Sequence, residues 1–166
     1  MSTHRNWRTC LDNTLPREHT SMPVHYHISP ELKLVIYICR GSVRGADIFK
    51  ASDRVFRDKR RVPSLRTIID FLSATENVQL GELQEAVRRI ESSAEQGFAP
   101  GPIVILSQSR NMQILVDTIN LMTHKVTFQI NMVSSLEAAI SLLGLSESKE
   151  EIVRFWQESE SFSASE

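Results

Sequence analysis

Short apolar segments alternate along this chain with longer segments whose apolar residues recur at helical spacing, and this alternation restricts the fold more than any other feature. The short segments are typical of β-strands and the longer ones of amphipathic α-helices. Strands that alternate with helices form parallel units joined by right-handed crossovers. The sequence therefore predicts a single α/β domain with a mixed sheet of four to five strands and helices packed on it.

The predicted strands cover Val24–Ile28, Leu32–Cys39, Leu65–Leu72, Ile103–Ser107 and Val126–Met132. The predicted helices cover Ala46–Arg57, Leu83–Ala94, Asn111–His124, and a segment that begins after Ser134 or Ser135 and ends at Gly144. Only a tight turn at Ser29, Pro30 and Glu31 separates the first two strands, so we expect them to form an antiparallel hairpin.

His25 and His27 lie two residues apart in the first predicted strand, so both imidazoles share one face and could reach one metal ion. A metal site needs three or four ligands, and the adjoining strand offers none at a matching offset. We therefore predict no metal site and expect both histidines on the solvent-facing side of an edge strand.

Three parts of the chain differ in pattern. Residues 1–21 show no periodicity, and we expect a flexible tail there. Residues 22–145 carry the α/β pattern. Residues 146–166 form an acidic tail, in which six glutamates stand against Lys149 and Arg154 for a net charge of about −4. The apolar residues of this tail indicate one more short helix that packs back on the domain, namely Ile152, Val153, Phe155 and Trp156.

Charge and composition exclude several classes of protein. The net charge of −1 gives no overall basic field, so we predict no nucleic-acid partner. Cys10 and Cys39 form neither a disulfide framework nor a zinc pattern. The longest apolar run, around Leu34–Cys39, is far shorter than the roughly 18 residues of a membrane span, and residues 1–21 lack the apolar core of a secretory signal. We expect a cytoplasmic protein that does not span a membrane.

One segment is strongly basic, although the net charge of the whole chain is only −1. Between Arg54 and Arg66 six cationic side chains stand against Asp58, a net charge of about +5. An anionic surface, an acidic partner or the acidic tail of the same chain could use such a cluster. Because the segment lacks interleaved aromatic residues and a DNA-reading helix, a solvated loop is the favoured interpretation.

No catalytic motif is visible. The segment Arg40–Gly45, "RGSVRG", lies between a strand and a helix but lacks the ending of a phosphate loop. Its glycines favour a strand exit and a helix entry, with a weak anion site as the alternative. Asp70 is the only acid within a strongly apolar strand. It either holds the loop that follows or serves as the acid of a site, and the sequence leaves both open.

Polar side chains follow the third and fourth predicted strands, namely Ser73, Ser107, Ser109 and Arg110. The helix that comes next has two apolar sides: Met112 and Leu115 lie on one, and Ile114 and Leu121 lie nearly opposite. One side must cover the sheet, which leaves the other for a partner, a second copy or an apolar ligand. We predict a partner or ligand surface made by this helix and the two loops, including Asp70.

Four stretches of the sequence carry a resemblance to a known family. They are the hairpin "VHYHISPELKLVIYICRGSVRGADIF", "IIDFLSATEN", "GPIVILSQSRNMQILVDTI" and "FQINMVSSLEAAISLLGL". Over about residues 22–145 the chain resembles the SpoIIAA-like branch of the STAS superfamily, also described as STAS/Sec14-like. The resemblance implies a mixed sheet of four or five strands with helices, and non-enzymatic regulatory or small-ligand roles.

In the anti-sigma-factor antagonists of that family, phosphorylation of a serine that opens the helix after the third strand switches partner binding. The corresponding region here reads "FLSATENVQLGEL" and lacks the Asp-Ser-Ser-Gly stretch, although Ser73 and Thr75 lie nearby. This departure prevents transfer of the phosphorylated residue.

The sequence thus predicts a bacterial regulatory or binding module without catalysis or cofactor that acts through protein–protein contacts, with a homodimer as a companion prediction. The alternative is a carrier or sensor of a lipid or other apolar small molecule. An enzyme is the least favoured class.

Overall fold

The computed structural model of this protein describes residues 22–96, 101–123 and 129–163. The strands are β1 (Val24–Ser29), β2 (Leu34–Cys39), β3 (Gly41–Val43), β4 (Arg66–Asp70), β5 (Ala74–Glu76), β6 (Ile103–Leu106) and β7 (Ile130–Val133). The helices are α1 (Gly45–Arg57), α2 (Leu80–Glu95), α3 (Arg110–Met122), α4 (Leu136–Leu142) and α5 (Lys149–Ser163), with a short 3₁₀ turn at Ser146–Ser148 before α5.

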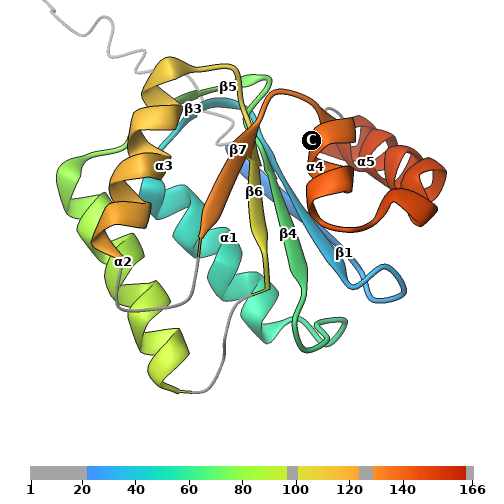
Figure 1. Ribbon diagram of the computed structural model, residues 1–166, viewed down its shortest axis with the longest axis horizontal. Coiled ribbons are helices and arrows are strands. Elements are labelled where there is room, and N and C mark those ends of the chain that lie inside the picture. Colours follow the sequence, from blue (N-terminus) through green and yellow to red (C-terminus); the bar gives the residue numbers. More distant parts are fainter. Residues whose placement is uncertain (1–21, 97–100, 124–128, 164–166) are drawn as a thin grey trace, which may run out of the picture.

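Five strands form the main sheet in the order β1-β2-β4-β6-β7. β1 pairs antiparallel with β2, and every other neighbouring pair is parallel. Helices α1, α2 and α3 cover one face of this sheet, and α4 and α5 cover the other (Figure 1). The predicted mixed sheet with an antiparallel N-terminal hairpin is confirmed.

The structure adds two strands that the sequence did not predict. β3 and β5 pair in parallel as a small separate sheet, where we expected a strand exit and a loop. A strand of three residues is too short to show a period of two. Gly41 has a φ of 64°, a left-handed conformation that favours glycine, and it lets the chain turn out of β2 into β3.

Part of the predicted pattern lies outside the described residues. This applies to residues 1–21, to His124 at the predicted end of the third helix, and to residues 126–128 at the start of the last predicted strand. The described part of that strand is β7.

The predicted helices agree with the structure to within about three residues, the largest difference being α2, which begins at Leu80 and not at Leu83. The serine cap of α4 was predicted, and that of α3 was not. Ser109 caps α3 by accepting a hydrogen bond from the Met112 amide, and Ser135 caps α4 in the same way through the Ala138 amide. Gly144 follows α4 with a φ of 67°, which suits the left-handed residue that ends a helix.

The face under α4 and α5 is closely packed. Its strand residues include Ile36, Ile38 and Ile68, each 0% exposed, and α5 contributes Ile152, also 0% exposed. The expected short C-terminal helix is thus a helix of 15 residues that seals one side of the sheet. In the described part of the chain, no helix is long and apolar enough to cross a bilayer.

Candidate functional site

Asp70 belongs to the closely packed face. Its carboxylate accepts hydrogen bonds from the Leu72 amide at 2.8 Å and from the Trp156 indole Nε1 at 2.9 Å, and the residue is 0% exposed. One oxygen therefore holds the loop after β4, and the other anchors α5. The sequence left two interpretations of Asp70 open, and its contacts agree with the first of them, a residue that holds the loop after β4.

The predicted serines divide into buried and exposed groups. Ser107 is 2% exposed and accepts a hydrogen bond from the Ser109 amide, while the Ser109 hydroxyl donates to Glu76 and caps α3. Ser107 and Ser109 thus shape the loop between β6 and α3. Ser73 and Arg110 are exposed near the carboxyl ends of β4 and β6 and are the accessible members of the predicted loop surface.

Helix α3 has two apolar sides, as its sequence indicates. Met112 is 4% exposed, and Leu115 packs beside it. On the other side Ile114 is 55% exposed and Leu121 is 77% exposed. The helix therefore contributes both to the core and to an apolar surface.

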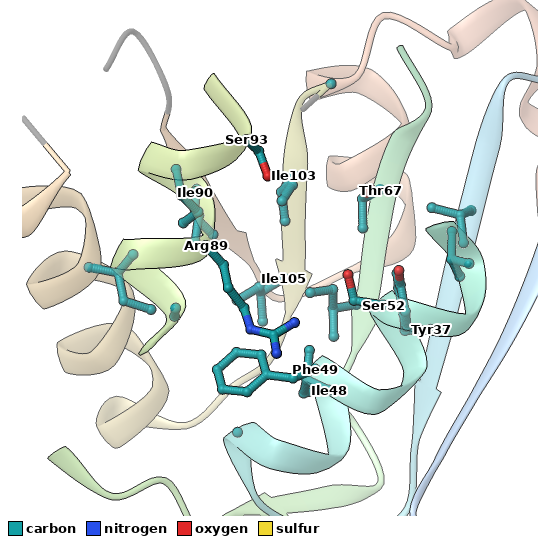
Figure 2. Close-up of a pocket in the computed structure, with 18 of the residues that line it drawn as sticks. Tyr37, Ile48, Phe49, Ser52, Thr67, Arg89, Ile90, Ser93, Ile103 and Ile105 are labelled. Carbon is teal, nitrogen blue, oxygen red and sulfur yellow. The ribbon is translucent and has the colours of Figure 1, made fainter. Parts of the chain in front are cut away.

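A large cavity lies between the sheet and the three helices α1, α2 and α3. Its volume is about 540 Å³. β2, β4 and β6 supply one wall with Tyr37, Ile69 and Ile105, and α3 supplies Leu115 and Ile119. Figure 2 shows side chains of α1, α2 and the strands converging on this space.

The alternation along each strand explains why one set of residues faces the cavity. Thr67 and Ile69 of β4 line it, whereas Ile68 and Asp70 belong to the opposite face. Gly101 fits where β6 approaches the segment before β4, since a Cβ there would lie 2.2 Å from the Leu65 carbonyl oxygen. The sheet wall thus requires this glycine.

A polar groove of about 380 Å³ between α1 and α2 adjoins the cavity. The two spaces share Ser52 and Phe56 of α1 and Arg89 and Ser93 of α2 as walls. A molecule entering between the two helices would pass these four side chains to reach the apolar interior.

Arg89 is held at this boundary by two carboxylates. Its guanidinium lies 2.9 Å from Asp53 on α1 and 2.8 Å from Glu85 on α2, and it stacks 4.7 Å from the centre of the Phe49 ring. Figure 2 shows Arg89 reaching toward Phe49, with Ile105 behind it. The charge of Arg89 is thus matched by the protein's own acids.

Tyr37 brings a hydroxyl to the cavity. It is 5% exposed, and its hydroxyl is hydrogen-bonded to Ser52; the two oxygens lie side by side in Figure 2. Burial raises the pKa of Tyr37 to about 12 because the phenolate would lose its hydration, although the bond to Ser52 works in the opposite direction. Tyr37 therefore stays neutral at physiological pH.

Glu82 also lines the cavity, but its carboxylate is engaged at two helix starts. It accepts from the Ala46 amide of α1 at 3.0 Å and from the Gln79 amide before α2 at 2.9 Å. Burial alone would raise the pKa of Glu82, but backbone N–H donors, including Gly45, outweigh it and lower that pKa. The weak anion site considered for the start of the first helix is thus occupied by a side chain of the protein.

Arg61 is the remaining charged residue of the cavity wall. Its guanidinium lies 4.5 Å from the centre of the Phe56 ring. Within the described residues it forms no ion pair with a carboxylate. The nearby Asp58 is instead engaged by Arg60, whose guanidinium lies 2.8 Å away and whose hydrogen bonds lower the pKa of that carboxyl.

His25, His27 and Cys39 are the histidines and the cysteine in the described part of the chain. His25 and His27 are half-buried, not solvent-facing, because α5 packs against β1 on their side of the sheet. In the described ranges no three His, Cys, Asp or Glu side chains cluster as metal ligands. Burial raises the pKa of the Cys39 thiol, which makes it unreactive.

Sequence reasoning missed the cavity, although two signals for it are present. Ser52 of α1 and Ser93 of α2 are small polar residues on the sides of these helices that line the cavity. Small polar residues at such positions indicate that the face does not pack fully on the sheet.

Comparison with known proteins gives only distant likenesses. No family model matches this chain, and no curated protein matches its sequence. Among solved structures it is similar to an uncharacterised protein of the DUF3478 family with a SpoIIAA-like fold from Shewanella loihica PV-4, at 11% identity and a TM-score of 0.47 over 72% of this chain and 91% of that chain.

It is also similar to the unphosphorylated form of the anti-sigma factor antagonist SpoIIAA, at 14% identity and a TM-score of 0.41 over 72% of this chain and 96% of that chain. The two descriptions name a SpoIIAA-like fold and SpoIIAA itself, which is the resemblance that the sequence predicted. At these identities the likeness concerns the fold alone.

Proposed function

We propose that this protein is a binding module without catalysis and that it holds an apolar small molecule between its sheet and helices α1, α2 and α3. The observation that carries this proposal is the cavity of about 540 Å³. Ligand sites in proteins measure roughly 300–1,000 Å³ and are lined mainly by apolar side chains with a few polar groups. An ordinary core contains few voids larger than a water molecule.

The charged and titratable groups of the wall support binding over catalysis. Glu82 ties two helix starts together, Arg89 is matched by two carboxylates, and Tyr37 is neutral. A general acid or base needs a pKa near the working pH and a free proton-transfer path. None of these three side chains offers that combination.

Native mass spectrometry of the protein as purified, followed by organic extraction, tests the proposal. We expect a bound apolar species, or stoichiometric uptake of added decanol by the emptied protein. The variant Ala86→Leu adds three carbons to the cavity wall on α2 and should weaken uptake while retaining the fold. If the emptied wild type takes up no decanol and releases no ligand on extraction, the proposal is wrong.

A second candidate function is regulation of a bacterial partner through protein–protein contacts. It is favoured by the exposed apolar side of α3, where Ile114 and Leu121 are 55% and 77% exposed, and by the accessible Ser73 and Arg110 on the adjoining loops. Exposed apolar groups on one helix side are typical of contact surfaces. The same surface could serve a homodimer.

Sedimentation analysis tests this second candidate in its homodimer form. A wild-type dimer that dissociates in Leu121→Glu, but not in the control Asn111→Glu, would support the surface. The control places the same charge at an exposed polar position of the same helix. A monomer that neither substitution changes would remove the homodimer from consideration.

A further inference from the structure

The cationic side chains of the cavity wall are not equivalent. Arg89 is neutralised by Asp53 and Glu85. Arg61 lines the same cavity without a carboxylate partner among the described residues. An apolar cavity with one unmatched cation suits a ligand that carries one negative charge at the end of an apolar body.

The position of Arg61 places that charge at the boundary of the cavity. Its guanidinium stacks on Phe56, and Phe56 borders both the cavity and the polar groove between α1 and α2. Arg61 is half-buried, so water reaches part of the side chain. A charged group held there would keep partial hydration while an attached chain lies in the apolar interior.

The surrounding charge favours an anion at this place. Arg61 belongs to the segment from Arg54 to Arg66 with a net charge of about +5. The acid of this segment, Asp58, is engaged by Arg60 and also accepts a hydrogen bond from the Tyr26 hydroxyl. The planar guanidinium of arginine matches carboxylate and phosphate oxygens in a two-pronged geometry.

We propose that the ligand is an anionic amphiphile, whose single apolar chain lies in the cavity and whose carboxylate or phosphate head binds Arg61. This inference rests on the proposed function, because it names the ligand class for the same cavity. It assigns to Arg61 the choice between anionic and neutral ligands, and it leaves to the apolar wall the affinity for the chain.

Four probes with the same alkyl chain separate these contributions: decanoate, decyl phosphate, decanol and decyltrimethylammonium. We expect calorimetric titration of the wild type to give both anions about tenfold tighter binding than decanol, since charge-assisted hydrogen bonds add about 1.5 kcal/mol or more. The cationic probe should bind weakest. The stronger of the two anions identifies the head group as carboxylate or phosphate.

The variant Arg61→Gln should bind both anions as weakly as decanol and leave decanol binding unchanged. The control Arg57→Gln removes a charge from the same basic segment at an exposed position of α1 that does not line the cavity, and it should retain the preference for anions. Salt dependence of wild-type binding gives a second measurement that needs no variant: added salt should weaken binding of the anions and not of decanol.

Two results overturn this inference while the proposed function stands: equal binding of decanol and the anions, or equal losses in Arg61→Gln and Arg57→Gln. Failure of all four probes to bind the wild type contradicts both the inference and the proposed function.

Discussion

The two faces of the main sheet differ in how completely their helices cover them. On one face, α4 and α5 pack on Ile36, Ile38 and Ile68, each 0% exposed. On the other face, α1, α2 and α3 leave a cavity of about 540 Å³ over β2, β4 and β6 (Figures 1 and 2). The same strands supply both walls through alternate residues, so the difference arises from the helices.

The contacts at each face explain the contrast. On the face under α4 and α5, here called the closed face, the Trp156 indole donates a hydrogen bond to Asp70, and Arg40 pairs with Glu160 of α5 at 2.8 Å. On the face under α1, α2 and α3, here called the open face, Arg89 joins α1 to α2 across the groove. These helices are therefore linked at their outer sides, and the cavity separates them over the sheet. One face therefore supplies stability, and the other supplies space for a ligand.

The largest expected effect is on the closed face. Ile152→Ala removes a fully buried side chain of α5 and should lower the free energy of unfolding by about 3 kcal/mol, measured by urea denaturation. Ile90→Ala, which enlarges the open-face cavity, should cost clearly less. Equal losses for the two variants would contradict the contrast between the faces.

Alkaline pH should destabilise the folded protein because the Tyr37 hydroxyl on the open face is buried. The unfolded chain loses the Tyr37 proton near pH 10, while the folded protein keeps it to about pH 12. Between these values the unfolded state binds fewer protons, so the free energy of unfolding should fall with rising pH, by about 2–3 kcal/mol at pH 12. Below pH 10 this group should have no effect.

Tyr37→Phe is the matched control for that pH dependence. Unfolding curves of both proteins should be measured between about pH 9 and 12, where tyrosines ionise. The difference between them gives the contribution of Tyr37, because Tyr26 is present in both. Parallel curves would show that Tyr37 ionises in the folded protein as readily as in the unfolded chain.

A larger side chain should destabilise the closely packed face more than the face with the cavity. Ala139 is a residue of α4 that faces the sheet and is 0% exposed, so Ala139→Leu overpacks the closed face and should cost about 1–3 kcal/mol. Ala86→Leu points into the cavity, and its cost should be close to zero. Thermal unfolding of both variants measures the difference, and an equal cost would indicate that the cavity closes around the larger side chain.

A small effect on stability is also expected at the groove. Asp53 and Arg89 are both partly exposed, with side-chain exposures of 52% and 41%, so Asp53→Asn should change the free energy of unfolding by no more than about 0.5 kcal/mol. Loss of this link between α1 and α2 should still speed ligand uptake in stopped-flow fluorescence. An unchanged uptake rate would show that entry does not depend on the ion pair.

Sequence periodicity predicted the five strands of the main sheet, the helices between them and the mixed pairing, because apolar spacing differs between strands and helices. It missed β3 and β5, which have only three residues each. The serine before α4 and Gly144 after it were also readable, since both act locally. The partner of Asp70 could not be predicted, because Trp156 lies 86 residues farther along the chain. The cavity escaped prediction because apolar residues occur on both faces of β4 and β6, so the strand pattern does not show which face the helices leave open.

Methyl NMR with labelled isoleucines, during titration of the emptied protein with decanol, tests the central claim most directly. The cavity methyls should shift, and these are Ile48, Ile69, Ile90, Ile103, Ile105, Ile119 and Ile130. The closed-face methyls should stay in place, and these are Ile36, Ile38, Ile68, Ile140 and Ile152. Saturable shifts confined to the first group are the predicted result. An absence of shifts, or shifts spread over both groups, would contradict a ligand site on the open face.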